Sequence, residues 1–299
     1  MQSLLDRVYK KAWLLLALTM LMWAGNSVAG RAIAGEMSPM AVVTLRWLAV
    51  CVVLAFVLGR DLAANAAILR LHWRRIALMG LFGFTGFNAL FYIAAYHTTA
   101  VNLTLMQAAI PAFVLAGSAL FFRTRVGPVQ LAGMGLTLGG VCLVATRGDL
   151  AHILALSFNI GDLLILVACL FYAGYTLALR HRPPVPALVF FAAMAGVAFL
   201  SSLPLLAAEA VAGQLYWPSL KGWLILAYVS LAPSLLAQVF FIRSVELIGP
   251  ARAGIFTNLV PVFGAFLAVV ILGEEFHLYH AMALGLALGG IALSERAKR

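Results

Sequence analysis

The chain has 299 residues, of which 64% are hydrophobic and 10% are charged, whereas soluble domains have about half and about a quarter. These proportions exclude a soluble globular protein and predict an all-α integral membrane protein with about ten spans of ~20 residues. The net charge of +10 does not indicate nucleic-acid binding, because the basic residues lie in small clusters between apolar runs, as loop charges of membrane proteins do.

Five apolar runs lie in each half of the chain, residues 1–149 and residues 150–299. The predicted spans of the first half are residues 12–34, 39–59, 75–97, 100–122 and 126–146. Those of the second half are residues 160–181, 185–208, 222–243, 251–272 and 277–294. We assign the cluster Arg60, Arg70, Arg74 and Arg75 to the loop between the second and third spans.

Loop charges predict the orientation of these spans. With the N-terminus inside, sixteen of the 20 basic residues fall in inner loops and tails, including Arg7, Lys10, Lys298 and Arg299. Arg31, Arg147 and Lys221 fall in outer segments, and Arg46 lies inside a span. This bias predicts a multi-pass membrane protein with both termini in the cytoplasm.

The two halves look like copies of one another at an offset of 150 residues. Pro111 matches Pro261, Trp73 matches Trp223, and the stretch Leu138-Gly139-Gly140 matches Leu288-Gly289-Gly290. Because five spans is an odd number, the second copy must be inverted in the membrane. Inverted five-helix repeats are typical of transporters that work by alternating access.

These features resemble a known family. The two five-helix halves, the Trp-Ala-Gly-Asn stretch at 23–26, the central prolines, Gly273-Glu274 after the ninth span and the glycine-rich closing helices are similar to the drug/metabolite transporter superfamily. The likeness covers essentially the whole chain and is closest to EamA-type ten-helix exporters, and among them to bacterial exporters of aromatic amino acids. It implies outward transport of small amphipathic metabolites across a lipid bilayer, that of the bacterial inner (plasma) membrane. In the first half Arg123-Thr124 replaces Gly273-Glu274, so a role for that motif is expected in the second copy alone.

The predicted spans have no acidic residue near their middle that could couple transport to protons. All ten acidic residues lie in loops, tails or near span ends, which predicts a facilitator without proton coupling. Arg46 stands seven residues beyond Pro39, so it lies ~10 Å deep at helical rise. A structural arginine bonded to neighbouring helix ends and a ligand-binding arginine both remain open.

Uncharged polar and aromatic side chains predict the lining of a substrate cavity, with bonds between helices as the alternative for each. Thr85, Asn88 and Tyr92 share one face of the third span, and Gln238 stands at the repeat equivalent of Asn88. The predicted substrate-binding residues are Trp23, Asn26, Asn88, Tyr92, Tyr96, Gln107, Tyr172, Tyr175, Gln238 and Asn258. Pro111 and Pro261 are predicted hinges, with simple kinks as the alternative.

Two glycine motifs, Gly135-x-x-x-Gly139 and Gly285-x-x-x-Gly289, predict packing surfaces of the fifth and tenth spans. We expect a monomer without a cofactor, a metal site or a nucleic-acid partner. Aromatic and bulky neutral amino acids fit a neutral, aromatic-lined cavity. Other metabolites or drugs, such as nucleosides and cationic compounds, remain alternative substrates, and a lipid-modifying membrane enzyme is the alternative class.

Overall fold

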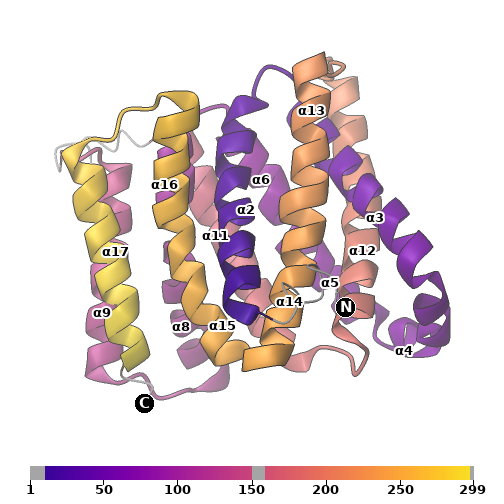
Figure 1. Ribbon diagram of the computed structural model, residues 1–299, viewed down its shortest axis with the longest axis horizontal. Helices are drawn as coiled ribbons and strands as arrows, with labels where there is room; N and C mark the ends of the chain where they lie inside the picture. The colour runs from indigo at the N-terminus through magenta and orange to yellow at the C-terminus, as the bar shows by residue number, and fades with distance from the viewer. Residues whose placement is uncertain (1–10, 150–158, 297–299) are drawn as a thin grey trace, which may run out of the picture.

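The computed structural model describes residues 11–149 and 159–296, which form a bundle of helices (Figure 1). The basic residues predicted for the extreme tails, Arg7, Lys10, Lys298 and Arg299, and the predicted start of the second half at residue 150 lie outside the described residues. In the first half the helices are α2 Ala12–Ala32, α3 Pro39–Ala64, α4 Ala66–Leu71, α5 Trp73–Gly80, η1 Leu81–Gly86, α6 Phe87–Ala94, α7 Ala100–Met106, α8 Ala109–Phe122 and α9 Pro128–Ala145. In the second half they are α11 Ile160–Ala178, η2 Leu179–His181, α12 Ala187–Val211, α13 Leu220–Val229, η3 Ser230–Leu236, α14 Ala237–Ile248, α15 Pro250–Ile255, η4 Phe256–Asn258, α16 Leu259–Leu272 and α17 Leu278–Arg296.

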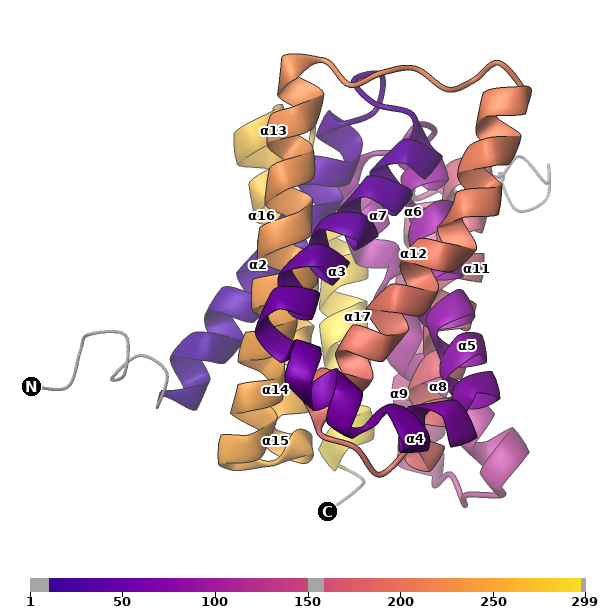
Figure 2. The same ribbon diagram turned by 90° about the vertical axis from the view of Figure 1, so that its right-hand side faces the viewer.

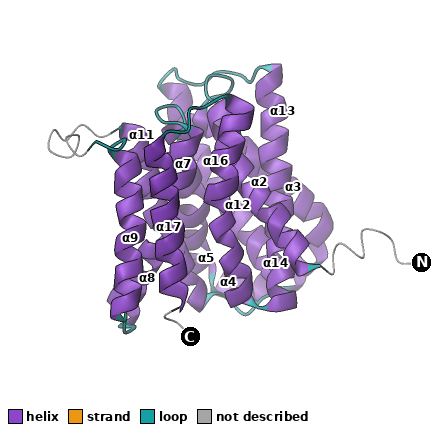
Figure 3. Cartoon of the chain, turned by 60° about the vertical axis from the view of Figure 1, so that its left-hand side comes forward, coloured by secondary structure: helices purple, strands orange, loops and turns teal. Residues whose placement is uncertain are grey.

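The ten predicted spans appear as helical segments close to their expected limits. Among the described residues, nine segments are long and apolar enough to cross a bilayer, and the tenth is the shorter apolar helix Leu278–Ser294. The loops gather at the two ends of the bundle, as Figure 3 shows. We call the end with the α2–α3 loop the Glu36 end, and the opposite end, with the α8–α9 loop, the Arg123 end.

One predicted loop is wrong. The cluster Arg60, Arg70, Arg74 and Arg75 was expected between spans, but α3 continues to Ala64 and the remaining arginines lie on α4 and α5. The apolar run ends at Gly59, while nothing in the following residues stops a helix before Asn65. Charged residues on a helix that leaves the bilayer are satisfied by water, so the helix extends past its apolar part.

Span ends carry local stop signals that the two halves share. Arg123 (φ 53°) and Gly273 (φ 67°) are left-handed residues at the ends of α8 and α16. The next backbone N–H in each case, that of Thr124 and that of Glu274, bonds a carbonyl six residues back. Left-handed residues commonly end helices, and the two ends share this backbone conformation and the following bond. The motif Gly273-Glu274 and its replacement Arg123-Thr124 therefore keep the same backbone geometry.

The third and eighth spans are each interrupted by a π-helical segment, η1 Leu81–Gly86 and η3 Ser230–Leu236. The fourth and ninth spans are each broken about one turn before Pro111 and Pro261, between α7 and α8 and at η4. A proline removes the helical bond to the carbonyl four residues earlier, which accounts for the position of both breaks. The irregularities therefore recur at the repeat offset.

The most extensive helix pairs join the two halves: α9 with α17, α3 with α12, and α2 with α16 and α14. Figure 1 shows α9 and α17 side by side, and Figure 2 shows α3 and α12 along another side. The core of the bundle is thus an interface between the halves, so a site in it takes residues from both copies.

The fifth and tenth spans do pack together, but the glycines predicted to form the contact are wrong. A Cβ added to Gly135, Gly139, Gly285 or Gly289 would meet nothing within 4 Å. A Cβ at Gly133 would lie 2.4 Å from the carbonyl oxygen of Gly290, and one at Gly140 would lie 2.7 Å from that of Ala283. The buried stripe is Gly133, Thr137 and Gly140 on α9, and Ala283, Ala287 and Gly290 on α17. Neighbouring helix positions differ by ~100°, so a shift of one residue turns the motif away from the interface.

Candidate functional site

A buried arginine lies at the junction of the two halves. The side chain of Arg46, on the second turn of α3, is 5% exposed. Its Nε donates to Ser234 Oγ at 2.6 Å, and its Nη1 donates to Asn88 Oδ1 at 2.7 Å and to the Tyr92 hydroxyl at 2.9 Å. We call these residues, together with Asn26, the Arg46 network.

The three acceptors are themselves held by the two π-helical segments and by α2. Ser234 lies in η3 and donates to the carbonyl of Val229, five residues back, while Asn88 follows η1 and donates to the carbonyl of Phe84 at 2.6 Å. The Tyr92 hydroxyl donates to Asn26 Oδ1 on α2 at 3.2 Å. Single π turns in helices are frequent at functional sites. Here they fix the orientation of the groups that hold Arg46.

The Arg46 network carries a charge that protein carboxylates do not balance. Within residues 11–149 and 159–296, Arg46 takes part in no ion pair, whereas Lys221 pairs with Glu36, Arg243 with Glu246 and His277 with Glu275. The Arg46 guanidinium carbon instead lies 5.4 Å from the centre of the Trp47 ring and 5.8 Å from that of Tyr92. Neutral oxygens and aromatic faces therefore surround this cation.

An aromatic layer extends from Arg46 towards α11. The Trp47 ring stacks on Phe84 with centres 4.8 Å apart, and Phe84 meets Tyr175 edge-on at 5.7 Å. Tyr175 meets Tyr172 at 5.4 Å, and Tyr172 meets Phe87 at 5.2 Å. The layer joins α3 and the third span to the sixth span, so it too crosses between the halves.

The residues predicted to bind substrate fall into several groups. Asn26, Asn88 and Tyr92 share the Arg46 network, and Tyr172 and Tyr175 share the aromatic layer. Trp23 Nε1 donates to the carbonyl of Pro233 in η3 at 3.2 Å, and its ring lies 5.2 Å from that of Phe241. Gln107 Nε2 donates to Ser27 Oγ at 3.3 Å and to the carbonyl of Leu103 at 2.9 Å. Gln238 and Asn258 are half-buried on α14 and η4.

Tyr96 lies apart from the others, although it shares a helical face with Tyr92 in the sequence. The helix ends at Ala94, and the Tyr96 hydroxyl donates to the carbonyl of Met37 at 2.6 Å at the Glu36 end. Burial and the bond to Tyr216 raise the pKa of its phenol. The predicted site set did not contain Trp47 or Phe84. The position of Trp47 directly after Arg46 was the one signal that could have included it.

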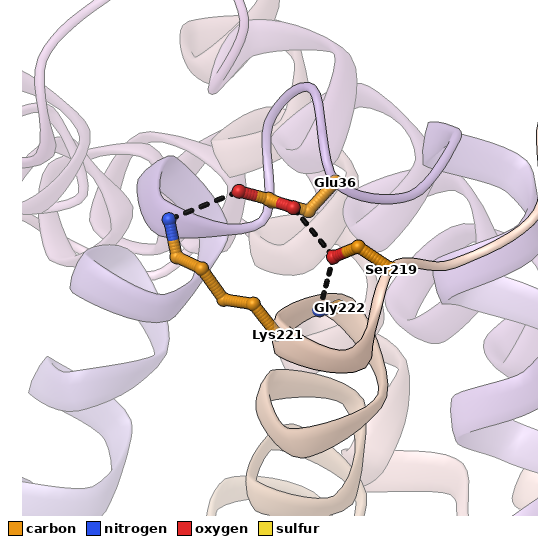
Figure 4. A network of polar contacts seen from close by, with 4 residues as sticks. All are labelled: Glu36, Ser219, Lys221 and Gly222. Atoms are coloured by element: carbon orange, nitrogen blue, oxygen red, sulfur yellow. Dashed lines mark hydrogen bonds and ion pairs between the residues drawn. The ribbon is translucent and has the colours of Figure 1, made fainter.

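At the Glu36 end, the α2–α3 loop is bonded to the start of α13 (Figure 4). Glu36 Oε1 pairs with Lys221 Nζ at 3.1 Å, and Glu36 Oε2 accepts from the Ser219 hydroxyl. Ser219 Oγ also accepts from the backbone N–H of Gly222 at 3.0 Å and caps α13. The bonds to Ser219 and to Lys221 lower the pKa of the Glu36 carboxyl.

Three further carboxylates at this end accept bonds from the other half. Glu209 accepts from the N–H of Met40 at 3.1 Å, and Asp162 accepts from Thr98 Oγ1 at 2.6 Å. Glu274 accepts from the N–H groups of Ala100 and Val101 at 2.8 and 2.9 Å, at the start of α7. Carboxylates suit helix N-termini because those N–H groups have no partner within the helix. Glu274, singled out by the Gly273-Glu274 motif, thus ties the two halves together.

The Arg123 end is joined by fewer such bonds between described residues. Ser244 Oγ donates to the carbonyl of Ala12 at 3.3 Å, and Ser294 Oγ donates to that of Gln130 at 3.3 Å. Both are side-chain bonds to a backbone carbonyl rather than bonds of carboxylates. The polar contacts between the halves are therefore concentrated at the Glu36 end.

Comparison with protein families gives two matches along the chain. The model of the EamA-like transporter family matches residues 10–146 and matches again over residues 159–296. The chain belongs to the EamA-like transporter family. This double match agrees with the predicted duplication, and it makes the protein a membrane transporter of the drug/metabolite type rather than an enzyme.

Relatives of this EamA-like transporter are described as transporters without an assigned substrate. An uncharacterized transporter of Archaeoglobus fulgidus is 26% identical, over 95% of this chain and 97% of the relative. The uncharacterized inner membrane transporter YedA of Escherichia coli K12 is 25% identical, over 73% of this chain and 69% of its own. A crystal structure aligns with a TM-score of 0.66 at 21% identity, covering 96% of this chain and 99% of the other, and this likeness supports the fold alone.

Proposed function

We propose that this EamA-like transporter exports aromatic and bulky neutral amino acids across the bacterial inner membrane by alternating access, as a monomeric facilitator. The observation that carries the proposal is the aromatic layer beside the Arg46 network, at the junction of the two halves. A ligand there meets hydrogen-bonding groups on one side and ring faces on the other, which suits a small amphipathic molecule. Repeat-related sites between halves are where such transporters bind substrate.

Charge distribution supports the orientation. The basic residues of the described chain at the Arg123 end are Lys11, Arg60, Arg70, Arg74, Arg75, Arg123, Arg125, Arg180, Arg182, Arg243, Arg252 and Arg296. The Glu36 end has Arg31, Arg147 and Lys221 together with most of the acidic residues of the described chain. By the positive-inside bias the Arg123 end faces the cytoplasm, which puts both termini there.

The contacts between the halves support alternating access. Carboxylates bond the halves together at the Glu36 end, so we assign the structure to a state closed towards the outside. Opening outward requires these bonds to break while the halves close at the Arg123 end. The breaks before Pro111 and Pro261 supply repeat-related points at which the fourth and ninth spans can bend.

The absence of proton coupling is part of the proposal. The Arg46 network consists of an arginine, which stays charged at every physiological pH, and of neutral partners. The carboxylates of the described spans lie towards the span ends, and two of them, Asp162 and Glu209, bond the halves there. Substrate then moves down its own gradient, and high internal concentrations produce net export.

Counterflow in proteoliposomes tests the proposal. Vesicles are loaded with unlabelled phenylalanine, tryptophan, leucine, uridine or ethidium, and uptake of labelled phenylalanine is followed at equal pH on both sides. We expect the three amino acids to drive uptake and uridine and ethidium to fail. Labelled uridine or ethidium that exchanges against its own unlabelled form where labelled phenylalanine does not exchange would support the alternative substrates. Accumulation of phenylalanine that follows an imposed pH gradient would contradict the facilitator mechanism.

A further inference from the structure

We propose that the Arg46 guanidinium binds the carboxylate of the transported molecule, so that the substrates are organic acids or zwitterions rather than neutral or cationic compounds. This inference deepens the proposed function and rests on it. It begins with the unbalanced charge of Arg46: an ionised side chain at membrane depth is costly and is normally paired. The described residues supply neutral partners and no carboxylate.

Arg46 also retains donors that the described residues do not use. A guanidinium has five N–H donors, and the three bonds of Arg46 engage Nε and Nη1. Among the described residues, no acceptor bonds to Nη2, which carries the other two N–H groups. Paired N–H groups of an arginine match the two oxygens of a carboxylate in a bidentate arrangement.

A second unpaired donor lies next to Arg46. The indole Nε1 of Trp47 is buried and has no hydrogen-bond partner among the described residues, although buried indole N–H groups normally find one. The Trp47 side chain is 3% exposed and adjoins the guanidinium at 5.4 Å. Two neighbouring groups with spare donors favour a ligand that accepts hydrogen bonds and carries negative charge.

Arg31 has a structural role, and its hydrogen bonds differ from those of Arg46. Arg31 Nη1 donates to the backbone carbonyl of Ala95 at 2.8 Å, at the C-terminal end of a helical segment. The three bonds of Arg46 all go to side chains, and each of those side chains is fixed by a further bond. Such an arrangement holds the guanidinium in place before a ligand arrives, which lowers the cost of binding.

The aromatic layer then selects the rest of the molecule. Trp47 and Phe84 continue from Arg46 to Tyr175, so a carboxylate bound at Arg46 places an attached ring or branched chain against aromatic faces. The buried positive charge repels cationic compounds by the same electrostatics that attract a carboxylate. A neutral nucleoside carries no negative charge to balance it.

The test measures competition against counterflow of labelled phenylalanine in proteoliposomes at equal pH. The competitors are 3-phenylpropionate, which keeps the carboxylate and the ring, and phenylalaninamide, which keeps the ring and the ammonium but lacks the carboxylate. With the wild-type protein we expect 3-phenylpropionate to inhibit at about 10- to 100-fold lower concentration than phenylalaninamide, because a bond to a charged group is lost with the amide. Equal inhibition by both compounds would overturn the assignment of Arg46.

Variants test whether Arg46 is the residue that binds the carboxylate. Arg46→Gln is expected to remove the preference for 3-phenylpropionate, and Trp47→Phe, which keeps a ring and loses the N–H, to reduce it several-fold. Arg31→Gln is the matched control and should keep the preference of the wild type. If Arg46→Gln does not fold, the wild-type ranking of the two compounds and Trp47→Phe still decide the question. A preference that persists in folded Arg46→Gln would show that another group binds the carboxylate.

The two proposals fail in different ways. If the protein catalyses no phenylalanine exchange, the proposed function is wrong. If phenylalanine exchange occurs and the amide competes as well as the acid, the proposed function stands and the role of Arg46 as a carboxylate site is wrong.

Discussion

Gly290→Leu is expected to destabilise the protein much more than Gly289→Leu, although the two glycines are adjacent. A Cβ at Gly290 would lie 2.4 Å from both the carbonyl oxygen of Gly133 and Thr137 Oγ1. Ordinary contacts of a Cβ begin at 3.4 Å, so α9 and α17 must separate by about 1 Å at this point, before the rest of the leucine is accommodated. At Gly289 the Cβ meets open space.

The magnitude follows from that separation. A gap of ~0.5–1 Å already forfeits a quarter to a half of the dispersion energy of atoms in contact, and α9 with α17 is the most extensive helix pair of the bundle. Overpacking of a tight contact costs about 1–3 kcal/mol. We place Gly290→Leu at the upper limit, about 3 kcal/mol, because the new side chain would meet the backbone of Gly133, which cannot rotate away as a side chain can. Gly289→Leu should stay within about 1 kcal/mol of wild type, since leucine favours a helix over glycine and meets no neighbour.

Thermal unfolding in detergent micelles measures both variants. At about 2–4 °C per kcal/mol, Gly290→Leu should lower the Tm by about 6–12 °C, while Gly289→Leu should shift it by no more than about 4 °C. Gly133→Leu on the facing helix should behave as Gly290→Leu does, with Gly139→Leu as its control. Equal shifts for the two members of a pair, or a larger shift for Gly289→Leu or Gly139→Leu, would refute the packing described here.

Three further outcomes are expected. Tyr175→Ala should raise the phenylalanine concentration for half-maximal counterflow about 5- to 10-fold, because an aromatic contact contributes about 1 kcal/mol. Tyr175→Phe should stay near wild type, and similar losses in both variants would assign the effect to the hydroxyl. Glu274→Gln should increase labelling from outside of a cysteine introduced at Ala100, because a weaker cap loosens the Glu36 end; unchanged labelling would contradict a closing role. The lowered pKa of Glu36 means that its bonds to Ser219 and Lys221 stabilise the closed end above pH ~4.5 and are lost as the pH falls through the lowered pKa. Thiol labelling itself slows as the pH falls, because the thiolate is the reactive form, so labelling is expressed relative to that of the same cysteine in Glu36→Gln at each pH. This ratio should rise only in acid below pH ~4.5.

The sequence allowed the spans to be predicted because in a membrane protein length and hydropathy are the dominant signals. It did not allow their rotation to be predicted. Lipid and protein interior are equally apolar, so hydropathy does not distinguish a face on lipid from a face on another helix. The error at Gly139 and Gly289 has this origin, since the next residue, Gly140 or Gly290, is the one in contact. Sequence spacing identified a glycine-rich helix pair and left the contacting stripe undetermined.

The candidate site could be predicted only in part, because the sequence gives the depth of a residue in its span but not the rotation of the span. Depth along a helix can be read from the sequence, so Arg46, Asn88 and Tyr92 were all expected within the membrane. The contact of Arg46 with Ser234 depends on how the eighth span is turned, and the π-helical segment η3 changes that turn. The stretch 81–86 carries no signal of an irregular turn, and Pro233 in the stretch 230–236 marks an interrupted helix without specifying a π turn. A side-chain network built on both stretches could therefore not be derived from spacing.

The position of Arg46 relates the substrate site to the motion proposed for the halves. Arg46 is held by Asn88 and Tyr92 of the first half and by Ser234 of the second, so its bonds cross the interface along which the halves must move. A carboxylate that binds the free side of the guanidinium offsets the unbalanced charge in whichever arrangement the halves adopt. Without it, any movement that breaks the bond to Ser234 leaves the cation with fewer partners at membrane depth, which is costly. The loaded transporter would then cross between states more readily than the empty one, and exchange would exceed net efflux at the same internal concentration.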